Sequence, residues 1–99
     1  MRVSMVGQEL LIVRILYDNP DGLYSTEIER LSKGVVLGSS LSSLLGRLAR
    51  KGYIARLDGR VRQSVLLKLT AFGVERLKQW AGLMGVTIVP NAFRRKEVS

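Results

Sequence analysis

Apolar and polar positions separate most clearly between residues 38 and 52, where leucines recur with the spacing of one helical face. They stand at positions 41, 44, 45 and 48, which is the i, i+3, i+4, i+7 pattern of an amphipathic helix. Ser39 can cap this helix at its start, and Gly52 can end it in a left-handed conformation. The pattern therefore predicts a helix over residues 39–51, with leucines on one face and serines, Gly46 and arginines on the other.

The segment 8–18 also has the length of a helix, but its apolar residues lie on nearly all sides. A helix with this pattern is buried on most sides, whereas a surface helix carries one apolar stripe. Two explanations stay open at this point. Either the helix runs through the middle of the fold, or one of its sides faces a second subunit. The sequence DNPDG at residues 18–22 predicts the turn that ends it.

Capping and turn signals predict the next elements. Thr26 to Glu29 matches the capping-box pattern and predicts the start of a second helix, which Leu23-Tyr24 precedes as a short extended piece. Residues 53–57 and 61–69 have the composition of strands. The sequence Asp58-Gly59-Arg60 lies between them, and an Asp-Gly pair is a strong hairpin signal because glycine tolerates a positive φ.

A final helix begins at Thr70, which is a favourable N-cap residue. Its inner stripe contains Val74, Leu77, Ala81 and Met84, with Trp80 beside it. The order helix, helix, helix, hairpin, helix is that of a winged helix-turn-helix domain. The predicted fold class is therefore mainly α (α+β), with a two-stranded β wing and a C-terminal helix.

This fold divides the chain into two parts. We expect residues 1–85 to form the winged helix-turn-helix domain, including its dimerisation helices, and residues 86–99 to form an extended, basic C-terminal tail. Within that tail, Arg94-Arg95-Lys96 is polar and is expected to be mobile.

The net charge is +8, and all of the excess lies in one block. Between Arg30 and Lys68 there are nine basic residues and one acidic residue, and the other segments sum to zero. This block covers the predicted third helix and the hairpin. A basic surface concentrated on these elements favours double-stranded DNA as the partner.

Composition excludes several other classes of function. The chain contains no cysteine and no histidine, which removes disulfides, zinc sites of the Cys/His kind and histidine-activated nucleophiles. No carboxylate pair lies in a plausible cleft, and the sequence 33–40 lacks the order of a phosphate-binding loop. We therefore expect no enzymatic activity, no cofactor and no metal. The apolar run at 10–16 is interrupted by Arg14 and is too short to span a bilayer, so a cytoplasmic protein is expected.

Candidates for DNA contacts come from the third helix and the wing. On the helix they are Ser39, Ser40, Ser42, Ser43, Arg47, Arg50 and Lys51, and on the wing they are Arg56, Arg60 and Arg62. Serine hydroxyls are short and can bond phosphates or base edges. Arg47 is long enough for a bidentate guanine contact, whereas Arg50 and Lys51 suit phosphates. Arginines that flank a tight turn suit a narrow minor groove.

Two of these features have a simpler explanation. For Ser39 the sequence favours a helix cap without any contact to DNA. Gly46 either lets the helix axis approach DNA or marks the close packing of two helices. The sequence alone leaves both alternatives open.

Three stretches resemble PadR-type regulators and, more loosely, MarR-type regulators: LYSTEIERL, GSSLSSLLGRLARKGYI and RVRQSVLLKLTAFGVERL. The shared features are a leucine-rich third helix ending in RKGYI, a basic wing, and a strand that runs into Leu69, Thr70 and Gly73. The resemblance implies a homodimeric DNA-binding transcription regulator, often a repressor, that dimerises through its terminal helices. The residues expected at that interface are Leu11, Ile15, Leu77, Trp80 and Met84. The sequence indicates no small-molecule effector.

Two other functions use the same surface. One is an architectural protein that binds DNA with little sequence preference, and the ratio of specific to non-specific affinity separates it from a regulator. The other is a winged-helix module that binds protein or RNA. Such a module has no need for positive charge concentrated on the third helix and the wing.

Overall fold

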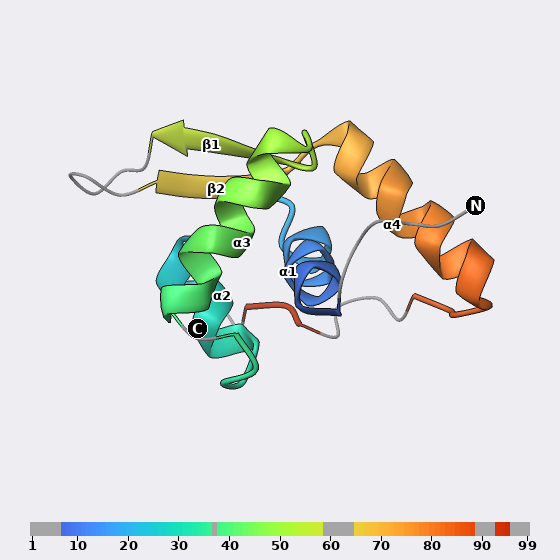
Figure 1. Cartoon of the computed structure of the whole chain (residues 1–99), viewed down its shortest axis with the longest axis horizontal. Helices are drawn as coiled ribbons and strands as arrows, with labels where there is room; N and C mark the ends of the chain where they lie inside the picture. The colour runs from blue at the N-terminus through green and yellow to red at the C-terminus, as the bar shows by residue number, and fades with distance from the viewer. Residues whose placement is uncertain (1–6, 37, 59–64, 89–92, 96–99) are drawn as a thin grey trace.

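The computed structural model describes residues 7–36, 38–58, 65–88 and 93–95. It contains the elements in the predicted order (Figure 1). They are α1 (Gly7–Asp18), α2 (Ser25–Leu31), α3 (Gly38–Arg50), β1 (Ile54–Asp58), β2 (Val65–Leu69) and α4 (Ala71–Met84). Among the helices in these ranges, none has both the length and the apolar character that crossing a bilayer requires.

Helix α1 lies at the centre of the molecule and contacts α2, α3, α4 and β2 (Figure 1). Its side chains Ile12, Val13 and Leu16 have no exposed surface. The apolar residues on its different sides are thus covered by different elements of the same chain. Of the two explanations that the sequence leaves open, the structure supports a helix that runs through the middle of the fold.

This central position corrects part of the expected dimer interface. Ile15 is fully buried and Leu77 is almost fully buried, and both belong to the hydrophobic core of the chain. A side chain that its own chain already covers offers no surface to a partner. Leu11 and Trp80 are only partly buried, and Met84 is exposed, so these three remain available at the surface.

Helix α3 has the two faces that its periodicity predicts. Leu41, Leu44, Leu45 and Leu48 are buried, whereas the four serines of its first two turns are exposed. The helix is followed by Gly52, whose φ of +82° is the left-handed conformation that favours glycine.

The structure confirms the predicted antiparallel pair of strands, and a third segment joins it. It corrects the position of Asp58, which the sequence places in the turn, because Asp58 is the last residue of β1 and pairs with Val65. β1 and β2 are antiparallel, with pairs running from Ile54–Leu69 to Asp58–Val65. Leu23 exchanges two backbone hydrogen bonds with Leu67, of 2.9 and 2.8 Å, as an isolated bridge. This confirms the short extended piece before α2. The strand predicted over 61–69 is described from Val65 onward, and residues 59–64 lie outside the described residues.

Helix α2 begins earlier than its capping-box pattern predicts. The expected box starts at Thr26 and uses Glu29, whereas the helix starts at Ser25 and the carboxylate that accepts a backbone bond belongs to Glu27. Glu27 Oε1 accepts a hydrogen bond from the backbone N–H of Tyr24 at 3.1 Å. The pattern of the capping box did not indicate this start, because the residue three positions before Glu27 is Tyr24 and not Ser or Thr.

Helix α4 begins as predicted, because Thr70 Oγ1 accepts a hydrogen bond from the backbone N–H of Gly73 at 3.0 Å. Gly73 lies directly against the hairpin. A Cβ atom at this position would lie 2.2 Å from the carbonyl oxygen of Tyr53, closer than any real contact. The absence of a side chain at Gly73 therefore lets α4 pack against the start of β1.

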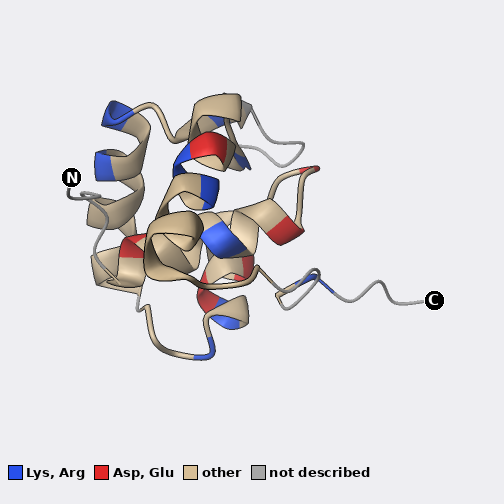
Figure 2. Cartoon of the chain, turned by 90° about the vertical axis from the view of Figure 1, so that its right-hand side faces the viewer, with Lys and Arg blue, Asp and Glu red and all other residues tan. Residues whose placement is uncertain are grey.

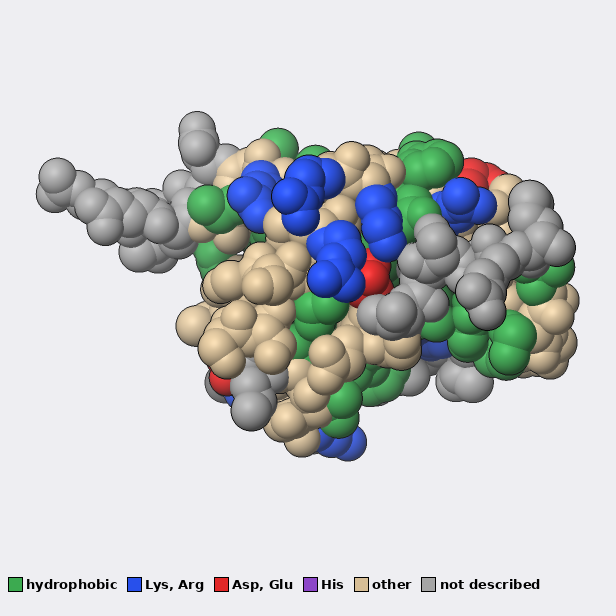
Figure 3. All heavy atoms as spheres, in the orientation of Figure 1, with side chains coloured by type: hydrophobic (Ala, Val, Ile, Leu, Met, Phe, Trp, Pro, Cys, Tyr) green, Lys and Arg blue, Asp and Glu red, His purple; other side chains and the backbone are tan. Residues whose placement is uncertain are grey.

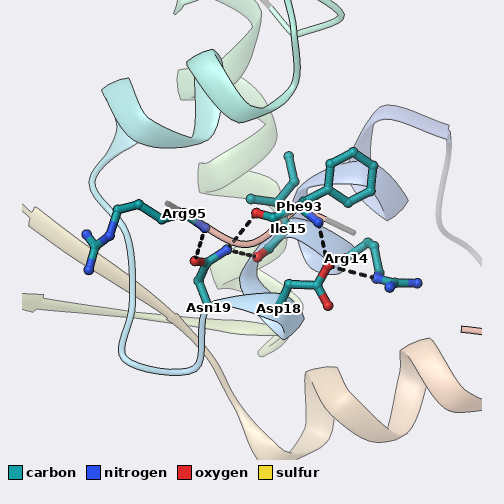
Figure 4. A network of polar contacts seen from close by, with 6 residues as sticks. All are labelled: Arg14, Ile15, Asp18, Asn19, Phe93 and Arg95. Atoms are coloured by element: carbon teal, nitrogen blue, oxygen red, sulfur yellow. Dashed lines mark hydrogen bonds and ion pairs between the residues drawn. The ribbon is translucent and has the colours of Figure 1, made fainter. Parts of the chain in front are cut away.

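The C-terminal segment does not behave as the expected mobile tail. Residues 93–95, which we call the C-terminal strap, lie against the end of α1 (Figure 4). Asp18 Oδ2 accepts a hydrogen bond from the backbone N–H of Phe93 at 2.8 Å. Asn19 donates to the carbonyl of Phe93 at 3.0 Å and accepts from the backbone N–H of Arg95 at 2.8 Å. These contacts correct the prediction of mobility for Arg95, whereas for Arg94 it stays a prediction and Lys96 lies outside the described residues.

Candidate nucleic-acid interface

The exposed face of α3 carries small, uncharged polar side chains along its first half. Its four serines are all exposed: Ser39, Ser40, Ser42 and Ser43. Gly46 and Arg50 come after them along the helix. At about 100° per residue, Arg50 lies opposite the leucine stripe, on the same side as Ser43. This face can approach a groove closely because none of its first side chains is longer than serine.

A hollow of about 470 Å³ opens between α3 and β1. It is lined by Ser42, Ser43, Gly46, Ala49, Arg50 and Arg56. The structure thus brings together four residues that the sequence placed on two separate elements. Two guanidinium groups and two hydroxyls around one hollow form a site for an anion such as a backbone phosphate.

Gly46 forms part of the wall of this hollow. A Cβ atom built on Gly46 has one neighbour within 4 Å, the Nη2 atom of Arg56 at 3.5 Å. Within the described residues, this Cβ atom has no neighbour on another helix, so the structure does not support the alternative of close helix packing at Gly46. A Cβ atom at this position would touch the Arg56 guanidinium at an ordinary contact distance, on the side of the helix that faces the hollow.

Arg47 on α3 and Lys51, the residue directly after α3, both contact an acidic residue that the sequence did not single out. Arg47 Nη1 lies 3.5 Å from Glu9 Oε1, and Lys51 Nζ lies 3.1 Å from Glu9 Oε2. The Glu9 side chain is only 1% exposed. A signal for it exists in the sequence, because Glu9 shares the helical face of Ile12, Val13 and Leu16, and a carboxylate on a buried face needs cationic partners.

The distribution of charge shows why net charge alone does not locate this surface. Basic and acidic residues alternate over several elements of the chain (Figure 2). On the molecular surface, however, Lys and Arg side chains gather over the end of α3 and over β1, with a broad uncharged area below them (Figure 3). An acidic side chain is visible beside this group (Figure 3). The surface therefore combines an arginine-rich part with a small, uncharged part.

The wing contributes one described arginine to this surface. Arg56 is exposed on β1, next to the hollow. Arg60 and Arg62, which the sequence places at the turn of the hairpin, lie outside the described residues. Their expected role in the minor groove stays a prediction.

Comparison with known proteins identifies the fold. No protein-family model matches the sequence, and no curated protein matches it significantly. Among solved structures, a mutant of MarR from E. coli complexed with operator DNA is similar, with a TM-score of 0.75 and 23% identity, covering 83% of this chain and 57% of that chain. The S. aureus MepR–DNA complex gives a TM-score of 0.69 at 23% identity, covering 82% of this chain and 59% of that chain. The fold is a winged helix.

A third similar structure widens the comparison. PcaV from Streptomyces coelicolor, in complex with its natural ligand, gives a TM-score of 0.72 at 18% identity, covering 82% of this chain and 56% of that chain. PcaV and MepR are described as transcription regulators, not as enzymes. The chain spans between 56% and 59% of the length of these solved chains. The resemblance to MarR-type winged helices is confirmed at the level of the fold, whereas these structures do not specifically support the PadR-type resemblance.

Proposed function

We propose that this winged-helix protein is a sequence-specific transcription regulator that binds double-stranded DNA, and that it acts as a repressor in the cytoplasm. The observation that carries the proposal is the exposed face of α3. The serines lie in its first two turns, and Ser42 and Ser43 also line the hollow that contains Arg50 and Arg56. The third helix of this fold is the element that enters the major groove. DNA complexes of the similar MarR and MepR structures agree with this role.

In this proposal the two parts of the surface have different tasks. The serines of α3 lie at the start of the helix, the end that reaches base edges in helix-turn-helix proteins. The hollow between Arg50 and Arg56 holds a phosphate of the backbone, and the hydroxyls of Ser42 and Ser43 add further donors. Phosphate contacts fix the register of the protein on the duplex, and base contacts select the sequence. Because PcaV was solved with its natural ligand, this fold is also compatible with an effector, which the sequence does not indicate.

We also propose that the regulator is a homodimer. The end of α4 and the residues after it expose Leu83, Met84 and Val86, and the exposed fraction of Met84 is 63%. Together with the partly buried Leu11 and Trp80, these residues are apolar surface that a second copy of the chain can cover. A two-fold dimer would place two α3 helices in successive major grooves, about 34 Å apart on the DNA.

The proposal is tested by selecting bound duplexes from a random DNA pool and titrating salt. We expect an enriched, pseudo-palindromic sequence and an affinity that falls steeply with salt concentration. Replacing Arg50 and Arg56 together by alanine should lower the slope of log affinity against log salt by about 1.8, since each lost phosphate contact contributes about 0.9. Lys78, exposed on α4, provides the matched control, and Lys78→Ala should leave the slope unchanged.

Two outcomes would redirect the proposal. Equal affinity for the selected and the random duplexes would replace the regulator by an architectural DNA-binding protein. Absence of any binding to duplex DNA at low salt would reject the DNA-binding function.

A further inference from the structure

Glu9 is the most buried acidic side chain next to the proposed DNA-binding surface. It lies in the first turn of α1, and its side chain is 1% exposed. Its two carboxylate oxygens face two cations, Arg47 of α3 at 3.5 Å and Lys51, directly after α3, at 3.1 Å. The proposed phosphate site lies elsewhere on α3, with Arg50 and Arg56. The basic residues of α3 are therefore of two kinds, those held by Glu9 and those that line the hollow.

The burial of Glu9 makes this pairing difficult to exchange. Removing the partner of a buried charge is strongly destabilising because the remaining charge stays uncompensated. A phosphate of the DNA backbone is an anion like Glu9, but it lies in water, whereas Glu9 is buried. Moving either side chain to a phosphate would therefore replace one ion pair by another and leave Glu9 with less compensation.

We propose that Glu9 is a specificity-determining residue, which withholds Arg47 and Lys51 from backbone phosphates and so lowers the affinity for DNA of arbitrary sequence. This inference rests on the proposed DNA-binding function. Contacts between cations of the protein and phosphates of the DNA backbone supply essentially all of non-specific binding. A carboxylate that keeps two cations away from the phosphates therefore lowers the affinity for non-specific DNA. The contact of Arg47 with Glu9 uses one terminal nitrogen, and half of the Arg47 side chain is exposed. Arg47 thus keeps donors for a base edge while its position is fixed.

The test compares two substitutions that change the net charge equally. Glu9→Gln removes the buried carboxylate, and Glu75→Gln removes an exposed one on α4. We expect Glu9→Gln to raise the affinity for a mixed-sequence duplex roughly three- to tenfold and to steepen the salt slope by about 0.9 for each cation released. The affinity for a selected sequence should rise less, so the ratio of the two affinities falls. Glu75→Gln should leave both the affinities and the slope near those of the wild type.

Epistasis with Arg47 separates the proposal from a general change of fold. In the wild type, Arg47→Gln should leave the mixed-sequence affinity and the salt slope unchanged. In the Glu9→Gln background, the same substitution should lower the slope by about 0.9, because Arg47 is then bound to a phosphate. Arg50→Gln provides the matched control on the same helix and should lower the slope in both backgrounds.

Several results would overturn the inference. One is that Glu9→Gln behaves like Glu75→Gln, or weakens binding without a change of slope. If Glu9→Gln does not fold, the single substitutions Lys51→Gln and Arg47→Gln in the otherwise wild-type protein test the inference. A lower salt slope in either variant would show that the replaced cation already contacts phosphate in the wild type, and would overturn the inference. Failure of the wild type to bind duplex DNA would instead reject the proposed function, so the two failures are distinguishable.

Discussion

At the scale of single residues, the proposed site contains side chains that are small and others that form ion pairs within the same chain. The four serines and Gly46 have the small side chains that let the exposed face of α3 come close to another molecule, and Gly46 lies beside the Arg56 guanidinium. Arg47, the residue that the sequence favours for reading guanine, is held by Glu9 instead of standing free. Identity and spacing predicted which residues of α3 are polar, but they did not predict which of them have partners inside the molecule.

Gly46 allows stability and DNA binding to be separated. Its φ is not in the left-handed region, and a Cβ would meet Arg56 at an ordinary contact distance of 3.5 Å. Gly46→Ala should therefore raise the free energy of unfolding by about 0.5–1 kcal/mol, as expected for alanine in a helix interior. The added methyl group narrows the hollow, so binding to duplex DNA should weaken several-fold. Thermal unfolding and a binding titration measure the two effects.

Gly82 supplies the control for this prediction. It lies in α4 with no atom within 4 Å of a built Cβ. Gly82→Ala should give a similar gain in stability and no change in DNA affinity. Equal DNA affinity of Gly46→Ala and the wild type would show that Arg56 and the hollow are not part of the interface.

At the scale of elements, the C-terminal strap connects segments that are far apart in the sequence. Arg95 Nη1 lies 2.7 Å from Glu27 Oε2, so the strap contacts the first turn of α2 as well as the end of α1. The strap therefore links the central helix to the first helix of the helix-turn-helix. Phe93 packs against the hydrophobic core at the same place.

This link should appear in the pH dependence of stability. Burial raises the pKa of Glu27, but hydrogen bonds from Arg95 and from the backbone of Tyr24 outweigh it, and the pKa lies below its ordinary value of 4.5. A lowered pKa in the folded state means that the ionised Glu27 stabilises the fold above about pH 4.5 and that this contribution is lost as the pH falls through the folded pKa.

Arg95→Ala should accordingly reduce the free energy of unfolding by roughly 0.2–1 kcal/mol at pH 7, the range for a partly exposed ion pair. The difference from the wild type should shrink as the pH is lowered from 7 toward 3, the direction in which Glu27 takes up its proton and loses its charge. Urea unfolding at both pH values measures it, with the exposed neighbour Arg94→Ala as the control. A difference that stays constant between pH 7 and pH 3 would contradict a role of the ion pair.

At the scale of the whole molecule, the described residues form one core around α1, the surface on α3 and β1 that we propose for DNA binding, and an exposed apolar end of α4 (Figure 1). The sequence predicted the order of all these elements and the winged-helix fold. It did not predict how the apolar surface is divided between core and interface. Ile15 and Leu77 have the same pattern as residues of a dimer interface, yet elements of their own chain cover them.

The proposed dimer predicts the effect of a charge at the exposed end of α4. Met84→Glu should shift the protein from dimer to monomer and leave its unfolding temperature nearly unchanged, because Met84 is 63% exposed in the single chain. Sedimentation over a range of concentrations measures the association. Val35 is a matched apolar residue with 55% exposure between α2 and α3, and Val35→Glu should leave the dimer intact. A wild type that sediments as a monomer at all concentrations would reject the dimer.

The sequence by itself determined the features that depend on near neighbours along the chain. The leucine stripe of α3, the cap at Thr70 and the pairing of β1 with β2 all follow from residues that are close along the chain, at most 15 positions apart in the hairpin. The local backbone fixes the geometry of such residues. Only the tertiary structure decided the pairings of Glu9 with Arg47 and Lys51, of Gly46 with Arg56, and of the strap with α1 and α2. These contacts join distant segments, and their geometry depends on how whole elements pack around α1, which no local periodicity specifies.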